Sequence, residues 1–108
     1  MKATKYLERK SIGECNEGWR RIVEPLVKLV ADRDGDIYQI KEKFGELRFY
    51  YSAKDPDGSV EQAIRVAEKA SSITCEVCGN PGQLRTFDSV WLSTLCDEHY
   101  KEELKDRQ

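Results

Sequence analysis

Three of the four cysteines in this chain and its only histidine form two pairs with the same internal spacing. Two residues separate Cys75 from Cys78 and Cys96 from His99, and seventeen residues lie between the pairs. Thiolate and imidazole groups suit zinc, and a two-residue gap allows both members of a pair to reach one ion at about 2.3 Å. The sequence therefore predicts that these four residues bind one Zn2+.

The predicted ligand set also indicates what such an ion does. Four protein ligands leave no position for water, and three thiolates make zinc a poor Lewis acid, so we expect a structural ion. With His99 bound, no histidine remains as a general base for Cys15 or a serine, and we predict no catalytic residues and no enzymatic activity. Cys15 is expected to be a small buried apolar group. The alternatives to a zinc site are a redox pair at Cys75 and Cys78 with an unrelated Cys96, or scattered buried cysteines.

The length of the chain, 108 residues, fits one small domain. We predict an α+β fold in which residues 1–70 form a helix–hairpin–helix part and residues 71–108 form a zinc-binding module packed on it. The module has too few residues for a stable core of its own, so the metal is expected to stabilise it. The N-terminus has charge but no apolar stretch behind it, which predicts a cytoplasmic protein without a membrane partner.

The helices of the first part are predicted from apolar spacing. An amphipathic helix begins near Trp19, with Asn16 as a candidate cap and with a kink or a new start at Pro25. Its apolar stripe consists of Trp19, Ile22, Val23, Leu26, Leu29 and Val30. A second helix follows residue 59, where Ser59 and Gln62 match a capping box.

Residues 37–52, between the two helices, predict a β-hairpin that turns at Phe44 and Gly45. The type of turn stays open, because a Phe residue tolerates a positive φ poorly. The apolar face that this turn creates pairs Ile40 with Phe49, Tyr38 with Tyr51, and Glu42 with Leu47.

The opposite face of this hairpin is polar and basic. It places Lys41 across from Arg48 and Gln39 across from Tyr50, with Lys43 across from Glu46. Like charges directly opposite each other are destabilising, so either a nearby carboxylate neutralises them or the face binds an anion or an acidic partner. We take Gln39, Lys41, Arg48 and Tyr50 as the candidate partner- or anion-binding residues.

The zinc module is predicted as a knuckle, a short hairpin and a helix. Residues 83–87 and 90–95 have strand character, and Thr94 is a candidate cap for a final helix that begins near Cys96. Cys96 and His99 would then share one face of its first turn. This order of elements resembles the treble-clef class of zinc folds.

Charge is distributed unevenly along the chain. Residues 1–54 contain 12 Lys and Arg against 9 Asp and Glu, whereas residues 55–108 contain 6 against 11. Because phosphate contacts dominate affinity for nucleic acids, an anionic partner should prefer the first half, and duplex binding through the acidic zinc module is disfavoured.

Four segments together resemble a family of small proteins of tailed phages and prophages. These are Gly18–Trp19, KEKFGELRFYY at 41–51, CEVCGNPG at 75–82 and TLCDEH at 94–99. The resemblance implies a viral setting inside a bacterial cell. We therefore expect a non-enzymatic accessory protein that binds a host protein stoichiometrically and inhibits an antiviral defence system. The alternative is binding or sequestration of a nucleotide or nucleic acid by the basic hairpin face.

Overall fold

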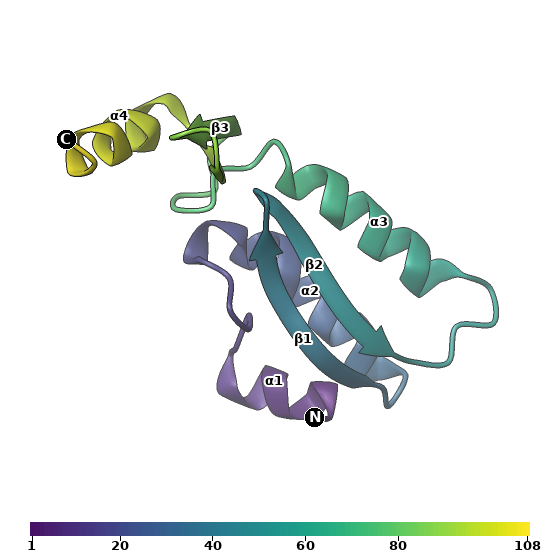
Figure 1. The fold of residues 1–108 in the computed structure, drawn as a ribbon. Coiled ribbons are helices and arrows are strands. Elements are labelled where there is room, and N and C mark those ends of the chain that lie inside the picture. Colours follow the sequence, from purple (N-terminus) through teal and green to yellow (C-terminus); the bar gives the residue numbers. More distant parts are fainter.

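The computed structural model describes residues 1–108 and confirms the α+β prediction (Figure 1). Its elements in chain order are α1 (Ala3–Arg9), a 3-10 turn (Glu17–Trp19), α2 (Arg20–Asp32), β1 (Asp36–Lys43), β2 (Glu46–Ser52), α3 (Ser59–Ser71), β3 (Gln83–Phe87), β4 (Trp91–Leu95) and α4 (Asp97–Asp106). The short helix α1 is absent from the sequence prediction. None of the helices has the length and apolar character that crossing a membrane requires.

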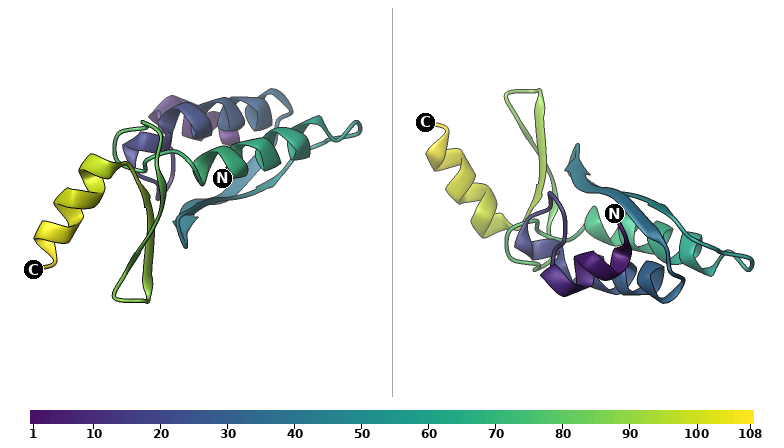
Figure 2. Two further views of the ribbon diagram at one scale, coloured as in Figure 1. Left: turned by 90° about the horizontal axis from the view of Figure 1, so that it is seen from above. Right: turned by 90° about the horizontal axis from the view of Figure 1, so that it is seen from below.

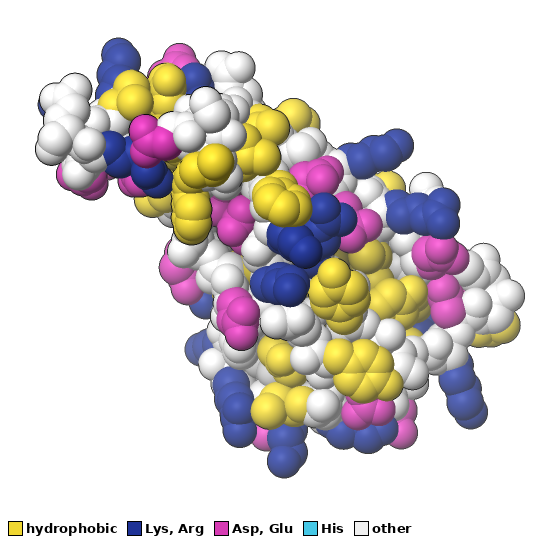
Figure 3. All heavy atoms as spheres, in the orientation of Figure 1, with side chains coloured by type: hydrophobic (Ala, Val, Ile, Leu, Met, Phe, Trp, Pro, Cys, Tyr) yellow, Lys and Arg dark blue, Asp and Glu magenta, His cyan; other side chains and the backbone are white.

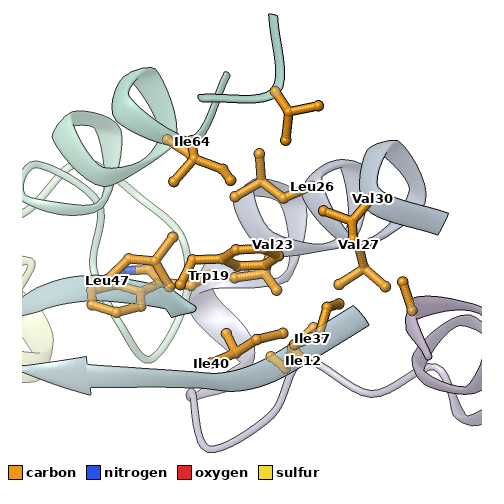
Figure 4. Packing of buried hydrophobic residues seen from close by; sticks show 14 residues of the cluster. Ile12, Trp19, Val23, Leu26, Val27, Val30, Ile37, Ile40, Leu47 and Ile64 are labelled. Carbon is orange, nitrogen blue, oxygen red and sulfur yellow. The ribbon is translucent and has the colours of Figure 1, made fainter. Parts of the chain in front are cut away.

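The main core lies between one face of the β1–β2 hairpin and the helices α2 and α3. Figure 2 shows both helices on the same side of this sheet, which leaves the other side open. Figure 4 shows side chains of α2 meeting those of the strands and of α3. The buried cluster comprises Ala3, Ile12, Trp19, Val23, Leu26, Val27, Val30, Ile37, Ile40, Leu47, Phe49, Val60, Ile64 and Ala67.

The predicted stripe of α2 faces the core, where Val23, Leu26 and Val30 are buried. Ile22 and Leu29 are half-buried against the same core. Of the two alternatives at Pro25, a new helix start is wrong. The helix runs as one element from Arg20 to Asp32 with Pro25 inside it. Proline removes one backbone donor, which leaves the carbonyl of Arg21 without its helical partner. Both residues are exposed, so water can satisfy that carbonyl and the helix continues. Asn16 precedes the 3-10 turn and makes no side-chain capping bond.

The β1–β2 register agrees with the prediction from Gln39 to the turn. Lys41 pairs with Arg48 and Gln39 with Tyr50, but Ile37 rather than Tyr38 pairs with Tyr51. A β-bulge between residues 37 and 39 turns the Ile37 side chain into the core and leaves Tyr38 65% exposed. The prediction that Tyr38 lies on the apolar face is therefore wrong, because a bulge inserts one residue and reverses the alternation beyond it.

The turn between these strands is a type I′ turn. Phe44 has φ of 54° and Gly45 has φ of 79°, and this turn type requires positive φ at both central positions. The carboxylate of Glu42 accepts a hydrogen bond of 2.7 Å from the Gly45 N–H. This bond fixes the turn although Phe44 is an unfavourable residue for it.

The start of α3 differs from the predicted capping box. The carboxylate of Asp55 accepts hydrogen bonds from the N–H groups of Val60 and Glu61, at 2.9 and 3.0 Å. Asp57 accepts one from the Ser59 N–H at 3.1 Å. Aspartates in the preceding loop therefore satisfy the free N–H groups of the first turn.

The second part of the chain has a small core of its own. Cys75, Phe87 and Leu95 are its buried members, beside the β3–β4 hairpin and α4. Figure 2 shows this hairpin projecting from the rest of the molecule on the side of the open sheet face. Thr94, predicted as the cap of the last helix, lies instead in β4, and Cys96 is the N-cap of α4.

Candidate functional site

Two pairs of ligand residues meet between the knuckle and the start of α4. The ligand atoms of Cys75, Cys78, Cys96 and His99 all lie within 4.8 Å of one another. The Cys78 and Cys96 Sγ atoms are 3.8 Å apart, and the His99 Nδ1 is 3.6 Å from the Cys75 Sγ and 3.2 Å from the Cys96 Sγ. A tetrahedral ion with bonds of about 2.3 Å to sulfur and 2.0 Å to nitrogen requires separations of about 3.5–3.8 Å. The separations in this structure scatter around these values, from 3.2 Å to no more than 4.8 Å, so the donor set is consistent with one metal ion.

Local hydrogen bonds position the ligand residues. The Cys75 N–H donates to the Asn80 carbonyl at 2.8 Å, and the Gly79 N–H donates to the Cys75 carbonyl at 3.0 Å, which closes the knuckle. Gly79 has φ of 81°, a conformation that favours glycine. The Cys96 sulfur accepts from the His99 N–H at 3.4 Å, so the N-cap of α4 is itself a ligand. This placement puts the second pair on the first helical turn, as the spacing predicts.

The surroundings of Cys75 favour its thiolate. Burial alone would raise the pKa of the Cys75 thiol, but hydrogen bonds from the backbone N–H groups of Cys96, Cys78 and Val77 lower this pKa to about 6. On the other side of the site, the Glu102 carboxylate lies 3.9 Å from the His99 Nε2. A carboxylate near the second ring nitrogen is a common way to orient a ligating histidine. The three-residue spacing of these two residues in α4 is the signal that sequence analysis missed.

The Gly18–Trp19 segment supports the knuckle from the first part of the chain. The Gly18 N–H donates to the Glu76 carbonyl at 2.8 Å, and the Trp19 Nε1–H donates to the Thr74 carbonyl at 2.9 Å. A Cβ atom on Gly18 would lie 2.3 Å from the Cys75 carbonyl oxygen. The glycine therefore permits the backbone of the knuckle to pack directly on the main core.

Glu76, between the first two ligands, has a buried carboxylate that the sequence analysis did not single out. It accepts a hydrogen bond of 2.6 Å from the Thr94 N–H, and burial raises the pKa of Glu76 to about 7. The Glu76 N–H donates to the Thr94 carbonyl at 2.9 Å. Glu76 thus holds the knuckle against the edge of β4.

The four predicted partner- or anion-binding residues lie together on the open face of the β1–β2 sheet. Lys41 is directly across from Arg48, and its Nζ is 5.9 Å from the centre of the Tyr50 ring. Gln39 pairs with Tyr50 next to them. The carboxylate nearest to Arg48 is Glu46 at 3.9 Å, and the buried Arg48 Nε has no hydrogen-bond partner. Figure 3 shows this face, where cationic side chains lie among hydrophobic ones.

Cys15 lies apart from the metal ligands and is half-buried against the main core. Burial, together with the charges of Glu76, Glu42 and Glu14, raises the pKa of the Cys15 thiol to about 12. A thiol with so high a pKa is a poor nucleophile at neutral pH, because the thiolate is the reactive form.

Comparison with protein-family models, with curated proteins and with solved structures finds no match.

Proposed function

We propose that the protein is a non-enzymatic binding protein in which one structural Zn2+ holds the last third of the chain. The donor set of three thiolates and one imidazole supports zinc over harder cations, which prefer oxygen ligands. The small core of three buried residues supports a structural role, because so little buried apolar surface cannot hold the segment alone. Metal analysis of protein purified without added metal should find one zinc per chain, and another metal or none would refute this part.

The exposed sheet face is the observation that best supports a binding function. Sheets usually bury at least one face. The β1–β2 sheet buries one face against α2 and α3 and presents Lys41, Arg48 and Tyr50 on its open face. Lys41 and Arg48 are half-buried and lie directly across from each other, and the only carboxylate within 4.0 Å of either is that of Glu46, 3.9 Å from Arg48. A partner that supplies carboxylates or another anion would remove the repulsion between these two cations, which is a reason for such a face to persist.

The partner class of the proposal is a host protein in the cytosol of a bacterium, bound stoichiometrically, with proteins of antiviral defence as the leading class. The support for this setting is the resemblance of four segments to proteins of tailed phages and prophages. Two of these segments, Gly18–Trp19 and the knuckle, pack against each other, so the resemblance covers residues that act together in this fold.

Capture from a bacterial lysate tests the proposal. The zinc-loaded protein should retain one partner in a fixed ratio, and the variant Lys41→Glu with Arg48→Glu should lose it. A matched variant, Lys101→Glu with Lys105→Glu, reverses the same number of charges on the exposed side of α4 and should retain the partner. The hypothesis of a protein partner fails if the wild type retains nothing that the double Glu variant loses.

Binding of a nucleotide or single-stranded nucleic acid is the second candidate function. It rests on one observation, the Lys41 ammonium group 5.9 Å from the Tyr50 ring on an open face, because nucleic-acid sites combine cations with aromatic stacking surfaces. Cyclic and linear nucleotides and short oligonucleotides should then raise the melting temperature of the wild type but not of the double Glu variant. Indifference to the whole panel would remove this candidate.

A further inference from the structure

The tips of the two hairpins carry large apolar side chains that are more than half exposed, although the Arg107 guanidinium lies 5.9 Å from the centre of the Trp91 ring. Phe44 is 58% exposed, Val90 is 80% exposed and Trp91 is 54% exposed. They line one groove of about 340 Å3 together with Glu42, Lys43 and Leu92. Figure 2 shows the two hairpins side by side with their tips pointing the same way. Exposed aromatic groups gathered in a groove are typical of protein-binding sites.

One wall of this groove is a free strand edge. The N–H and the carbonyl of Thr94 both form hydrogen bonds with Glu76, which shows that they point away from β3. Backbone groups alternate along an antiparallel strand, so the N–H and carbonyl of Leu92, two residues earlier, point to the same outer side. Residues 90–95 contain no proline and no charge, which are the usual means of blocking an edge. The Leu92 N–H and carbonyl on the outer edge of β4 are therefore available to pair with an added strand, whereas those of Thr94 are occupied by Glu76.

The charges near the groove indicate the chemistry of its occupant. Lys43 lies 5.5 Å from the centre of the Phe44 ring, and neither Lys43 nor Lys41 has a carboxylate within 4.0 Å. Glu42 is engaged with the backbone of the turn through the Gly45 N–H. Glu42 keeps its negative charge in the groove beside Lys43, but the open sheet face that adjoins the groove carries Lys41, Lys43 and Arg48 against Glu46. The net charge beside the groove is therefore positive, and it complements acidic side chains.

We propose that this groove binds an extended acidic segment of a partner protein, which adds as a strand to the outer edge of β4. The inference rests on the proposed function, and it assigns the partner's contact segment. The Leu92 backbone provides the pairing, Phe44 and Trp91 receive alternate apolar side chains, and Lys43 faces the acidic ones. A two-fold contact would bring this basic surface against its own copy, so a second copy of this chain complements it less well.

Selection from a display library of random octapeptides on the zinc-loaded full chain tests the inference. Enriched peptides should alternate apolar with acidic residues and bind one per chain. Leu92→Pro should weaken their binding about tenfold or more, because it removes the outward N–H without removing a β3–β4 bond. Phe44→Gly should weaken binding similarly and also relieves the positive φ, so loss of folding does not explain its effect. Val66→Ala, which truncates an exposed residue of α3, is the matched control.

Three outcomes overturn the assignment. The first is that no enriched peptide binds Leu92→Pro and Phe44→Gly more weakly than it binds Val66→Ala. The second is enrichment of basic peptides. The third is a dimer in sedimentation that Leu92→Pro abolishes, which would give this edge to a second copy. The groove and the proposed function can fail independently. If Leu92→Pro and Phe44→Gly retain a lysate partner that the Lys41 and Arg48 double variant loses, the groove assignment is wrong and the proposed function stands.

Discussion

Replacing Gly18 by alanine tests whether the knuckle depends on close packing against the first part of the chain. The added Cβ would lie 2.3 Å from the Cys75 carbonyl oxygen and 2.4 Å from the Glu76 carbonyl carbon. Ordinary contacts between such atoms are about 3.5 Å, so the two segments must separate by about 1 Å. The movement also weakens the hydrogen bond from the Gly18 N–H to Glu76, which is 2.8 Å long.

The expected loss of free energy is the sum of the overpacking and the weakened hydrogen bond. Overpacking costs about 1–3 kcal/mol and a lost backbone hydrogen bond about 1 kcal/mol, which together give about 2–4 kcal/mol. Expressed entirely in metal binding, this strain would lower the affinity about 30- to 1000-fold. Because the loop containing Gly18 can relax in part, we expect a loss of about 10- to 100-fold, the range found when groups that support metal ligands are changed.

Competition with a chromophoric chelator measures the metal affinity, and urea unfolding measures the stability. Gly58→Ala is the matched control, since Gly58 has φ of 74° but nothing within 4 Å of the position of an added Cβ. The control should lose about 1 kcal/mol of stability from backbone strain and keep the wild-type metal affinity. If Gly18→Ala binds metal as tightly as Gly58→Ala does, the knuckle does not depend on this contact and the reasoning is wrong.

Three further changes probe the rest of the fold. Removing the metal with a chelator should abolish hydrogen-exchange protection in residues 83–106 while amides of residues 20–32 stay protected, and retained protection of β3 and β4 would contradict a metal-dependent module. Trp19→Phe should cost about 1–3 kcal/mol in urea unfolding, because the Thr74 carbonyl loses its 2.9 Å partner in a partly buried setting. Ile37→Ala should cost about 2–5 kcal/mol and Tyr38→Ala less than about 0.5 kcal/mol, and the reverse order would disprove the bulge.

Short-range patterns allowed the sequence to predict the metal ligands and most of the hairpin register. The spacing of Cys75, Cys78, Cys96 and His99 leaves few other ways to satisfy three thiols and an imidazole, and the structure brings them together. The register from Gln39 to the turn follows from alternation alone. These features depend on residues close in sequence, where periodicity and ligand chemistry are sufficient.

The features that the sequence did not predict depend on tertiary contacts or on competing local groups. The bulge at Tyr38 turns Ile37 inward toward the main core, which the alternation of a single strand does not reveal. Asp55 caps α3 from a loop, although the nearer Ser59 matches the usual pattern. The role of Gly18 appears only when the knuckle, almost sixty residues later, packs on it.

Thr94 connects the metal module to both proposed binding surfaces. Its hydroxyl donates to the Gly45 carbonyl at 2.6 Å, which fixes the β1–β2 turn against β4, and its backbone groups bond to Glu76 in the knuckle. A metal ion that orders the knuckle therefore also orders the edge of β4 and the position of the Phe44 turn beside it. On this view the structural metal has a functional consequence, because loss of the ion would separate the two walls of the groove while leaving the main core folded.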